Sequence, residues 1–120
     1  MTQKIPTPGC PVRGSKTGKP IMVLFDLLGR SWALGIIWHL AETPLTFRQL
    51  QRSCEGVSPT VLNTRLKELR ASNLVEHRRD GYALTATGLQ LFSLLQPLGN
   101  WSGNWARQLL RDSTDRDRFS

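Results

Sequence analysis

A group of polar side chains able to hydrogen-bond an external partner lies within residues 58–70. Plotted at about 100° per residue, this stretch gathers its leucines on one side of a helix: Leu62, Leu66 and Leu69. The opposite side carries polar residues: Thr60, Asn63, Thr64 and Lys67. Asn pairs with adenine, Thr bonds a base edge or contacts a thymine methyl, and Lys suits guanine or phosphate. The pattern predicts a helix that enters the major groove; the alternative is an ordinary solvated face.

Two more residues of this stretch belong to the predicted contacts. Ser58 and Pro59 stand in the order of an N-cap and a first helical residue, and we include Ser58 among the DNA-contacting residues. Arg65 falls beside the leucine stripe. Two interpretations of Arg65 stay open: an ion pair with Glu68 one turn further on, or a long stem that carries the guanidinium round to a phosphate.

A second basic cluster lies at the predicted tip of a hairpin and consists of His77, Arg78 and Arg79. Such a tip can reach phosphate or the neighbouring minor groove, although charge on an edge strand also discourages aggregation. Arg48 and Arg52 precede the reader helix and are expected either to position the protein on phosphates or simply to be solvated.

We expect different roles for the two cysteines. Cys10 lies near Arg13 and Lys16, whose charge would favour a reactive thiolate, whereas Cys54 occupies an apolar position and is expected in the core. Together with the two histidines they lack metal-ligand spacing, so we predict no metal site. Residues 9–17 lack the Gly-Lys pair and preceding strand of a phosphate loop, and no acid–base set is recognisable. We therefore expect neither an enzyme nor a cofactor.

The elements that must position these groups follow from the periodicity and the punctuation of the chain. Residues 1–20, with four Pro and three Gly, predict an extended, partly mobile arm. Helices are expected over residues 21–28, over residues 32–42 with Ser31 as N-cap, and from Thr46, whose spacing to Gln49 is that of a capping box. Gly56 ends the last of these, and the reader helix follows. Two short helices around a glycine turn are typical of a helix-turn-helix.

The second half of the chain predicts a hairpin and a long helical segment. Residues 74–79 and 82–85 read as strands joined by a tight turn at Asp80-Gly81. Apolar residues at helical spacing then run from Leu89 to Leu110, and the alternating Arg and Asp of residues 111–120 are expected to fray. The predicted fold is mainly α with a small β-hairpin wing, in one domain over residues 21–110.

Composition agrees with an anionic partner in a reducing compartment. The 120 residues carry 16 Lys and Arg against 9 Asp and Glu, for a net charge of +7. Two cysteines are too few for a disulfide framework, and the start of the chain lacks the pattern of a signal peptide. No apolar run approaches the ~20 residues of a membrane span. We expect a cytoplasmic protein without a membrane partner.

Taken together, the chain resembles the HxlR-type branch of winged helix-turn-helix regulators, which is related to the MarR group. The resemblance covers about residues 9–105 and rests on the order and spacing of short segments: Gly9-Cys10-Pro11-Val12, Leu27-Leu28-Gly29-Arg30-Ser31-Trp32, Phe47-Arg48-Gln49-Leu50, Gly56-Val57-Ser58-Pro59, Val61-Leu62, Arg65-Leu66-Lys67-Glu68-Leu69, Asn73-Leu74-Val75 and Tyr82-Ala83-Leu84-Thr85 up to Gly88. It departs from the family at the wing, which is short and carries no proline, and in its charged tail.

The resemblance implies a bacterial transcription regulator that binds a palindromic operator on double-stranded DNA as a homodimer. The first and last helices would hold the dimer, and the half-sites would lie ~34–36 Å apart. It also implies that Cys10 matches a cysteine with which some members sense oxidants or electrophiles. Two alternatives stay open: a redox or small-molecule sensor acting through Cys10 or an apolar pocket, and a winged helix used for protein docking.

Overall fold

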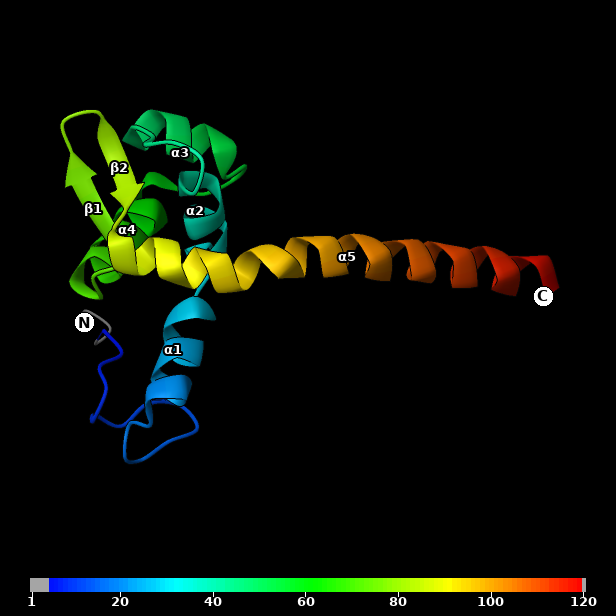
Figure 1. The fold of residues 1–120 in the computed structure, drawn as a ribbon, viewed down its shortest axis with the longest axis horizontal. Helices are drawn as coiled ribbons and strands as arrows, with labels where there is room; N and C mark the ends of the chain where they lie inside the picture. Colours follow the sequence, from blue (N-terminus) through cyan, green and yellow to red (C-terminus); the bar gives the residue numbers. More distant parts are fainter. Residues whose placement is uncertain (1–4, 120) are drawn as a thin grey trace. The chain divides into compact units, whose positions relative to one another are not determined.

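The computed structural model describes residues 5–119, with side chains described as far as residue 113. The elements in chain order are α1 (Pro20–Leu28), α2 (Ala33–Leu40), α3 (Phe47–Ser53), α4 (Pro59–Ala71), β1 (Val75–Arg78), β2 (Gly81–Leu84) and α5 (Ala86–Phe119), as Figure 1 shows. The chain divides into two compact units between Leu89 and Gln90, within α5. The mainly helical fold with one hairpin is the predicted one.

The first unit packs around side chains from α1 to α4 and from the hairpin. Its largest fully buried side chains are Ile36, Ile37, Leu50, Leu62, Leu66, Leu69 and Cys54. Each fully buried aliphatic side chain contributes roughly 1.5–3 kcal/mol relative to an exposed one. Because Leu62, Leu66 and Leu69 are buried, the leucine stripe of α4 is confirmed as its core-facing side. The predicted core position of Cys54 is confirmed as well.

Local capping explains where α3 and α4 begin. The Thr46 hydroxyl accepts from the Gln49 amide at 3.2 Å, and the Gln49 side chain accepts from the Thr46 amide at 2.9 Å, which confirms the capping box. The Ser58 hydroxyl accepts from the Val61 amide at 3.1 Å ahead of α4. Between the two helices Gly56 has φ +85°, a conformation that favours glycine. The helix-turn-helix thus forms as predicted.

The start of α2 differs from the prediction. Ser31 does not cap this helix; Trp32 stands at the N-cap with φ +71° and no side-chain cap, and α2 begins at Ala33. The reason is tertiary, because the Ser31 carbonyl accepts a hydrogen bond at 2.8 Å from Nε of Arg65 on α4. The corner between α1 and α2 is therefore shaped by its contact with α4 rather than by a local cap.

The hairpin turn has two residues as expected, but it lies one position earlier than predicted. Strand pairing runs from Val75 with Leu84 to Arg78 with Gly81, so the two tip residues are Arg79 and Asp80, not Asp80 and Gly81. Gly81 is the first residue of β2, and the backbone of Leu45 lies against it. A Cβ on Gly81 would stand 2.5 Å from the Leu45 carbonyl oxygen, and its φ is +126°.

Leu45 forms an isolated antiparallel β-bridge with Tyr82 of the hairpin. Its amide donates to the Tyr82 carbonyl at 2.9 Å, and the Tyr82 amide donates to the Leu45 carbonyl at 2.7 Å. These two bonds attach the wing to the residue that precedes α3, so the hairpin does not stand alone.

The extended arm predicted at the start of the chain does not form over residues 5–19. The Gly9 amide donates to the Gly18 carbonyl at 3.0 Å, and Val12 and Ser15 exchange backbone hydrogen bonds of 2.9 and 3.0 Å. The segment folds back on itself because its glycines permit positive φ, +87° at Gly9 and +69° at Gly18. Residues 1–4 of the expected arm lie outside the described residues.

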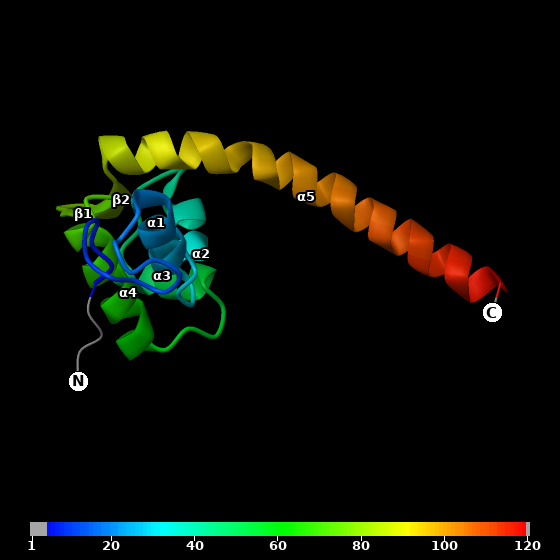
Figure 2. The ribbon, with the colours of Figure 1, turned by 90° about the horizontal axis from the view of Figure 1, so that it is seen from below.

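The helix α5 passes through Pro97 without a break and continues to Phe119, where fraying was expected (Figure 2). After Gly103 no Gly or Pro interrupts the sequence, and Arg, Leu and Gln are good helix formers. In the second unit large apolar side chains are exposed: Leu94, Leu98, Trp101, Trp105, Leu109 and Leu110.

Among the described helices, none is by itself long and apolar enough to cross a membrane. Taken together, α1 and α2 reach the length and composition of a broken span, but the two helices are bent by 85°. Both helices also contribute to the core of the first unit, α1 through Val23 and Leu27 and α2 through Ile36 and Ile37.

Candidate nucleic-acid interface

The exposed face of α4 carries the predicted base-contacting groups. Thr60, Asn63, Thr64 and Lys67 are all exposed, while Leu62, Leu66 and Leu69 on the other side are at most 1% exposed. The Thr64 hydroxyl donates to the Thr60 carbonyl one turn back at 2.9 Å, and its oxygen can still accept a hydrogen bond. Within residues 5–113 the side chains of Thr60, Asn63 and Lys67 have no hydrogen-bond or ionic partner. A row of unpartnered polar groups on a rigid helix is available for an external partner.

Arg65 is held on the core-facing flank of α4. Its Nη1 contacts Oε1 of Glu68 at 2.7 Å and its Nε donates to the Ser31 carbonyl at 2.8 Å, with the side chain only 15% exposed. Of the two interpretations left open, the ion pair with Glu68 is the one in the structure. Arg65 therefore does not join the exposed row of α4. Burial, and secondarily the charge of Arg30, lower the pKa of Arg65.

Glu68 is a buried carboxylate with two arginine partners. It is 4% exposed, it contacts Arg65 through one oxygen, and it pairs with Nη1 of Arg30 through the other. Arg30 also lies 3.8 Å from Asp26 in α1. A buried carboxylate is tolerated only when it is paired and hydrogen-bonded, so this arrangement fixes α4 to the corner after α1. The role of Arg30 was missed from the sequence because it lies 38 positions from Glu68 and carries no local signal.

The wing presents one of its three predicted basic residues at the tip. Arg79 is exposed there and has no ionic partner among the described residues. Arg78 is paired with Glu76, its Nη2 and Nε lying 2.5 and 2.6 Å from Oε1. His77 is not at the tip, because its register partner is Tyr82 and the two rings stack with centroids 4.1 Å apart. The Arg78 pair is half-exposed, so it is worth only about 0–1 kcal/mol and a phosphate can replace it.

The exposed face of α4 and the wing meet at one hollow. A cavity of about 540 Å³ is lined by residues of both elements: Lys67, Arg70, Ala71, Asn73, Val75, Glu76, His77 and Thr85. The structure thus brings Lys67 and His77 to the same surface. Arg48 and Arg52 are exposed on α3, and Ser58 is exposed at the start of α4.

The cysteines lie in different surroundings. Cys10 is half-buried in the N-terminal loop, and Cys54 is 1% exposed in the core, where burial raises the pKa of its thiol. Within the described part of the chain, no three His, Cys, Asp or Glu side chains come together as metal ligands.

These features define a winged helix-turn-helix domain. Two capped helices are joined at a glycine turn, the second helix has an outward polar face, and the hairpin is bonded to Leu45 just before α3. The family model described as HxlR-like helix-turn-helix matches residues 27–109. The chain belongs to this family, whose members are transcription regulators and not enzymes.

Relatives at the sequence level are HTH-type transcriptional regulators. The uncharacterized regulator BH0655 of Halalkalibacterium halodurans is 31% identical over 68% of this chain and 80% of its own length. YodB of Bacillus subtilis is 31% identical over 65% of this chain and 76% of its own length. An uncharacterized regulator of the archaeon Methanocaldococcus jannaschii, MJ0925, is 26% identical over 70% of this chain and 83% of its own.

Solved structures show the same fold. Quinone-bound YodB from B. subtilis matches with a TM-score of 0.65 and 30% identity, covering 71% of this chain and 97% of YodB. A possible HxlR family transcriptional factor from Thermoplasma volcanium matches with a TM-score of 0.64 and 34% identity, covering 70% of this chain and 82% of its own.

Replacing the buried carboxylate tests the anchor of α4. Glu68→Gln leaves Arg30 and Arg65 without their shared anion in a buried position, so we expect a loss of about 3 kcal/mol in the free energy of unfolding. Urea denaturation followed by circular dichroism measures it. Glu55→Gln is the matched control, because Glu55 is exposed and its replacement should change stability by less than about 0.5 kcal/mol. Equal stabilities of the two variants would contradict the assignment.

Proposed function

We propose that the protein is a sequence-specific DNA-binding transcription regulator that acts on the bacterial chromosome in the cytoplasm. The observation that carries the proposal is the exposed, unpartnered polar row of α4, backed by its buried leucine stripe. In this arrangement α4 enters the major groove. Asn63 is the residue with bidentate geometry for adenine, and Lys67 suits guanine or phosphate.

The neighbouring groups position the protein on the DNA backbone. The Ser58 hydroxyl accepts from the Val61 amide and keeps its own hydrogen available for a phosphate at the start of α4. Arg79 at the wing tip, Arg78 through exchange of its surface pair, and Arg48 on α3 supply positive charge around this helix. Because the wing tip consists of two residues, we expect it to contact phosphate rather than to insert into the minor groove.

A DNA-binding titration with single variants tests the reader face. On a duplex selected by the protein from random sequences, Asn63→Ala should weaken specific binding by about tenfold and leave non-specific binding unchanged. Lys67→Ala should lower the affinity and, if Lys67 contacts phosphate, reduce the slope of log affinity against log salt by about 1. Fluorescence anisotropy at several salt concentrations provides both quantities.

The control for charge is Lys16→Ala, which removes one cation from the N-terminal loop and should leave specific binding within about twofold of the parent. Unchanged specific affinity in Asn63→Ala would contradict the reader-face assignment. Affinity that does not depend on salt would favour the alternative, in which the winged helix docks a protein and its basic face is merely solvated.

We further propose that the regulator is a homodimer on a palindromic operator, held in part by α5. Apolar side chains at positions 94, 98, 101, 105 and 109 recur every three or four residues and are all exposed in the single chain. Trp101 and Trp105 stack with centroids 5.9 Å apart, forming a broad apolar surface. A continuous exposed stripe of this kind is typical of an interface between helices.

Sedimentation velocity tests the dimer. Trp101→Glu places a charge in the stripe, so we expect the protein to sediment as a monomer at micromolar concentrations where the parent is a dimer. Gln96→Glu adds the same charge on another side of α5 and should leave the dimer intact. A monomeric parent, or a dimeric Trp101→Glu variant, would argue against this interface.

A second proposal is that DNA affinity responds to an oxidant or electrophile through Cys10. It is supported by the half-buried position of Cys10 and by the likeness to YodB, which has been solved in quinone-bound, diamide-treated and reduced forms. A quinone, which adds to a single thiol, should lower the affinity of the parent for its operator, and Cys10→Ser should lose this response. Cys54→Ser should keep it, because Cys54 is enclosed in the core. A response that persists in Cys10→Ser would exclude Cys10 as the sensor.

A further inference from the structure

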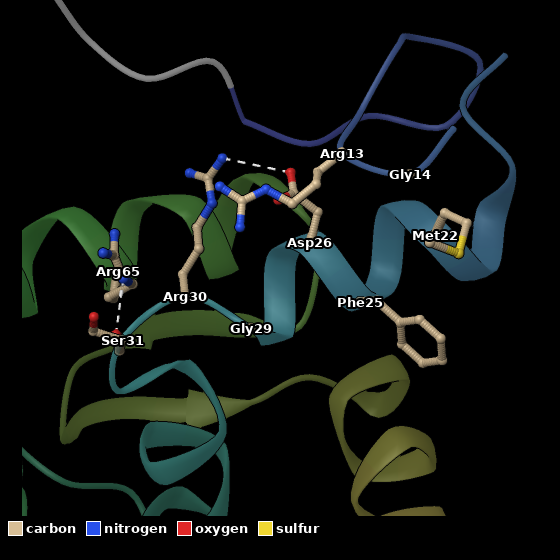
Figure 3. A pocket seen from close by; sticks show the side chains of 9 residues that line it. All are labelled: Arg13, Gly14, Met22, Phe25, Asp26, Gly29, Arg30, Ser31 and Arg65. Carbon is tan, nitrogen blue, oxygen red and sulfur yellow. Dashed lines mark hydrogen bonds and ion pairs between the residues drawn. The ribbon is translucent and has the colours of Figure 1, made fainter. Parts of the chain in front are cut away.

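An arginine-lined cavity lies between the N-terminal loop, α1 and α4, on the first unit. Its volume is about 490 Å³, within the range of small-ligand sites. Six of its lining residues carry the argument: Arg13, Met22, Phe25, Asp26, Arg30 and Arg65. Figure 3 shows Arg13 and Arg30 reaching the same part of the cavity as Asp26, with Arg65 below them beside Ser31.

The charges around this cavity do not cancel. Arg30 and Arg65 share the carboxylate of Glu68, and Arg30 also lies 3.8 Å from Asp26. Arg13 is exposed and has no ionic partner within the described part of the chain. The cavity lining holds Arg13, Arg30, Arg65 and one carboxylate, Asp26. With the carboxylate of Glu68, which lies behind the lining and is shared by Arg30 and Arg65, one positive charge is left in excess. A planar carboxylate fits guanidinium groups well because it accepts two parallel hydrogen bonds.

The apolar part of the lining comes mainly from α1. Met22 and Phe25 contribute side chains from α1, and Gly14 packs so closely on Met22 that an added Cβ would lie 2.5 Å from its terminal methyl carbon. A monoanion with a small apolar body matches one excess charge beside an apolar wall. Free phosphate, which is a mixture of singly and doubly charged ions near neutral pH and has no apolar body, matches it less well because Asp26 would repel the second charge.

We propose that this cavity binds a small organic carboxylate, with Arg13 as the main binding residue and Arg30 beside it. Arg65 reaches from the cavity to the Ser31 carbonyl and to Glu68, so an occupant would lie next to the contacts that hold α4. The site would then serve as an effector site, a consequence that rests on the proposed DNA-binding function. The binding of the carboxylate does not rest on that function.

Nuclear magnetic resonance titration of the DNA-free protein tests the site, so a failure of DNA binding cannot be mistaken for a failure here. Benzoate should shift the amides of Gly14 and Gly29 in a saturable manner, with a dissociation constant on the order of 1 mM. Neutral benzamide and inorganic phosphate should bind at least about tenfold more weakly. Arg13→Gln should weaken benzoate about tenfold, and Arg13→Lys should restore part of the affinity.

The matched control is Lys16→Gln, which removes the same charge from the same loop without lining the cavity and should bind benzoate like the parent. No saturable shift with benzoate, or equal binding by benzamide, would overturn the proposal. So would equal weakening in Arg13→Gln and Lys16→Gln, since that result would mark a general charge effect. Phosphate binding as tight as benzoate would overturn the choice of a carboxylate.

Discussion

The orientation of α4 depends on one buried carboxylate. Glu68 cannot be buried as an anion without partners, since the cost of an unpaired buried charge is several kcal/mol. Arg65 supplies one partner from the same helix, and Arg30 supplies the other from the corner between α1 and α2. That corner must therefore lie against α4, and the Ser31 carbonyl completes the contact. The leucine stripe gives α4 its burial, and the arginine–glutamate cluster gives it a defined rotation, so that Asn63 and Lys67 face outward.

The wing is held by a comparable long-range constraint. Leu45 exchanges two backbone hydrogen bonds with Tyr82, and this contact requires glycine at position 81. The turn is thereby confined to Arg79 and Asp80, and the ring of His77 stacks on Tyr82 instead of pointing from the tip. The result is a short, rigid wing with one free arginine at its end. Such a wing suits backbone contact better than insertion into a groove.

The proposed functions use different groups of the same small domain. On α4 the side chains of Thr60, Asn63 and Lys67, and at the wing tip that of Arg79, have no partner among the described residues and are available to a DNA interface. Cys10 and Arg13, the proposed main binding residue of the arginine-lined cavity, lie in the N-terminal loop, which the HxlR-like family match does not include because the match begins at residue 27. Both proposed effector responses thus involve the N-terminal loop, which folds back on itself where an extended arm was expected.

The sequence by itself determined the elements whose signals are local. The Thr46–Gln49 capping box, the Ser58-Pro59 start of α4 and the leucine stripe each depend on residues within one or two turns, so the helix-turn-helix and its outward polar row could be predicted. Only the tertiary structure decided the contact between Arg65 and Ser31, which are 34 residues apart in the sequence and share a hydrogen bond. The same holds for Arg30 with Glu68 and for the folded N-terminal loop. In the two arginine contacts a polar group is satisfied by a partner far along the chain, and the spacing of residues gives no signal of that pairing. In the loop the hydrogen bonds are local, but they form only because glycines adopt positive φ, a conformation that composition does not specify.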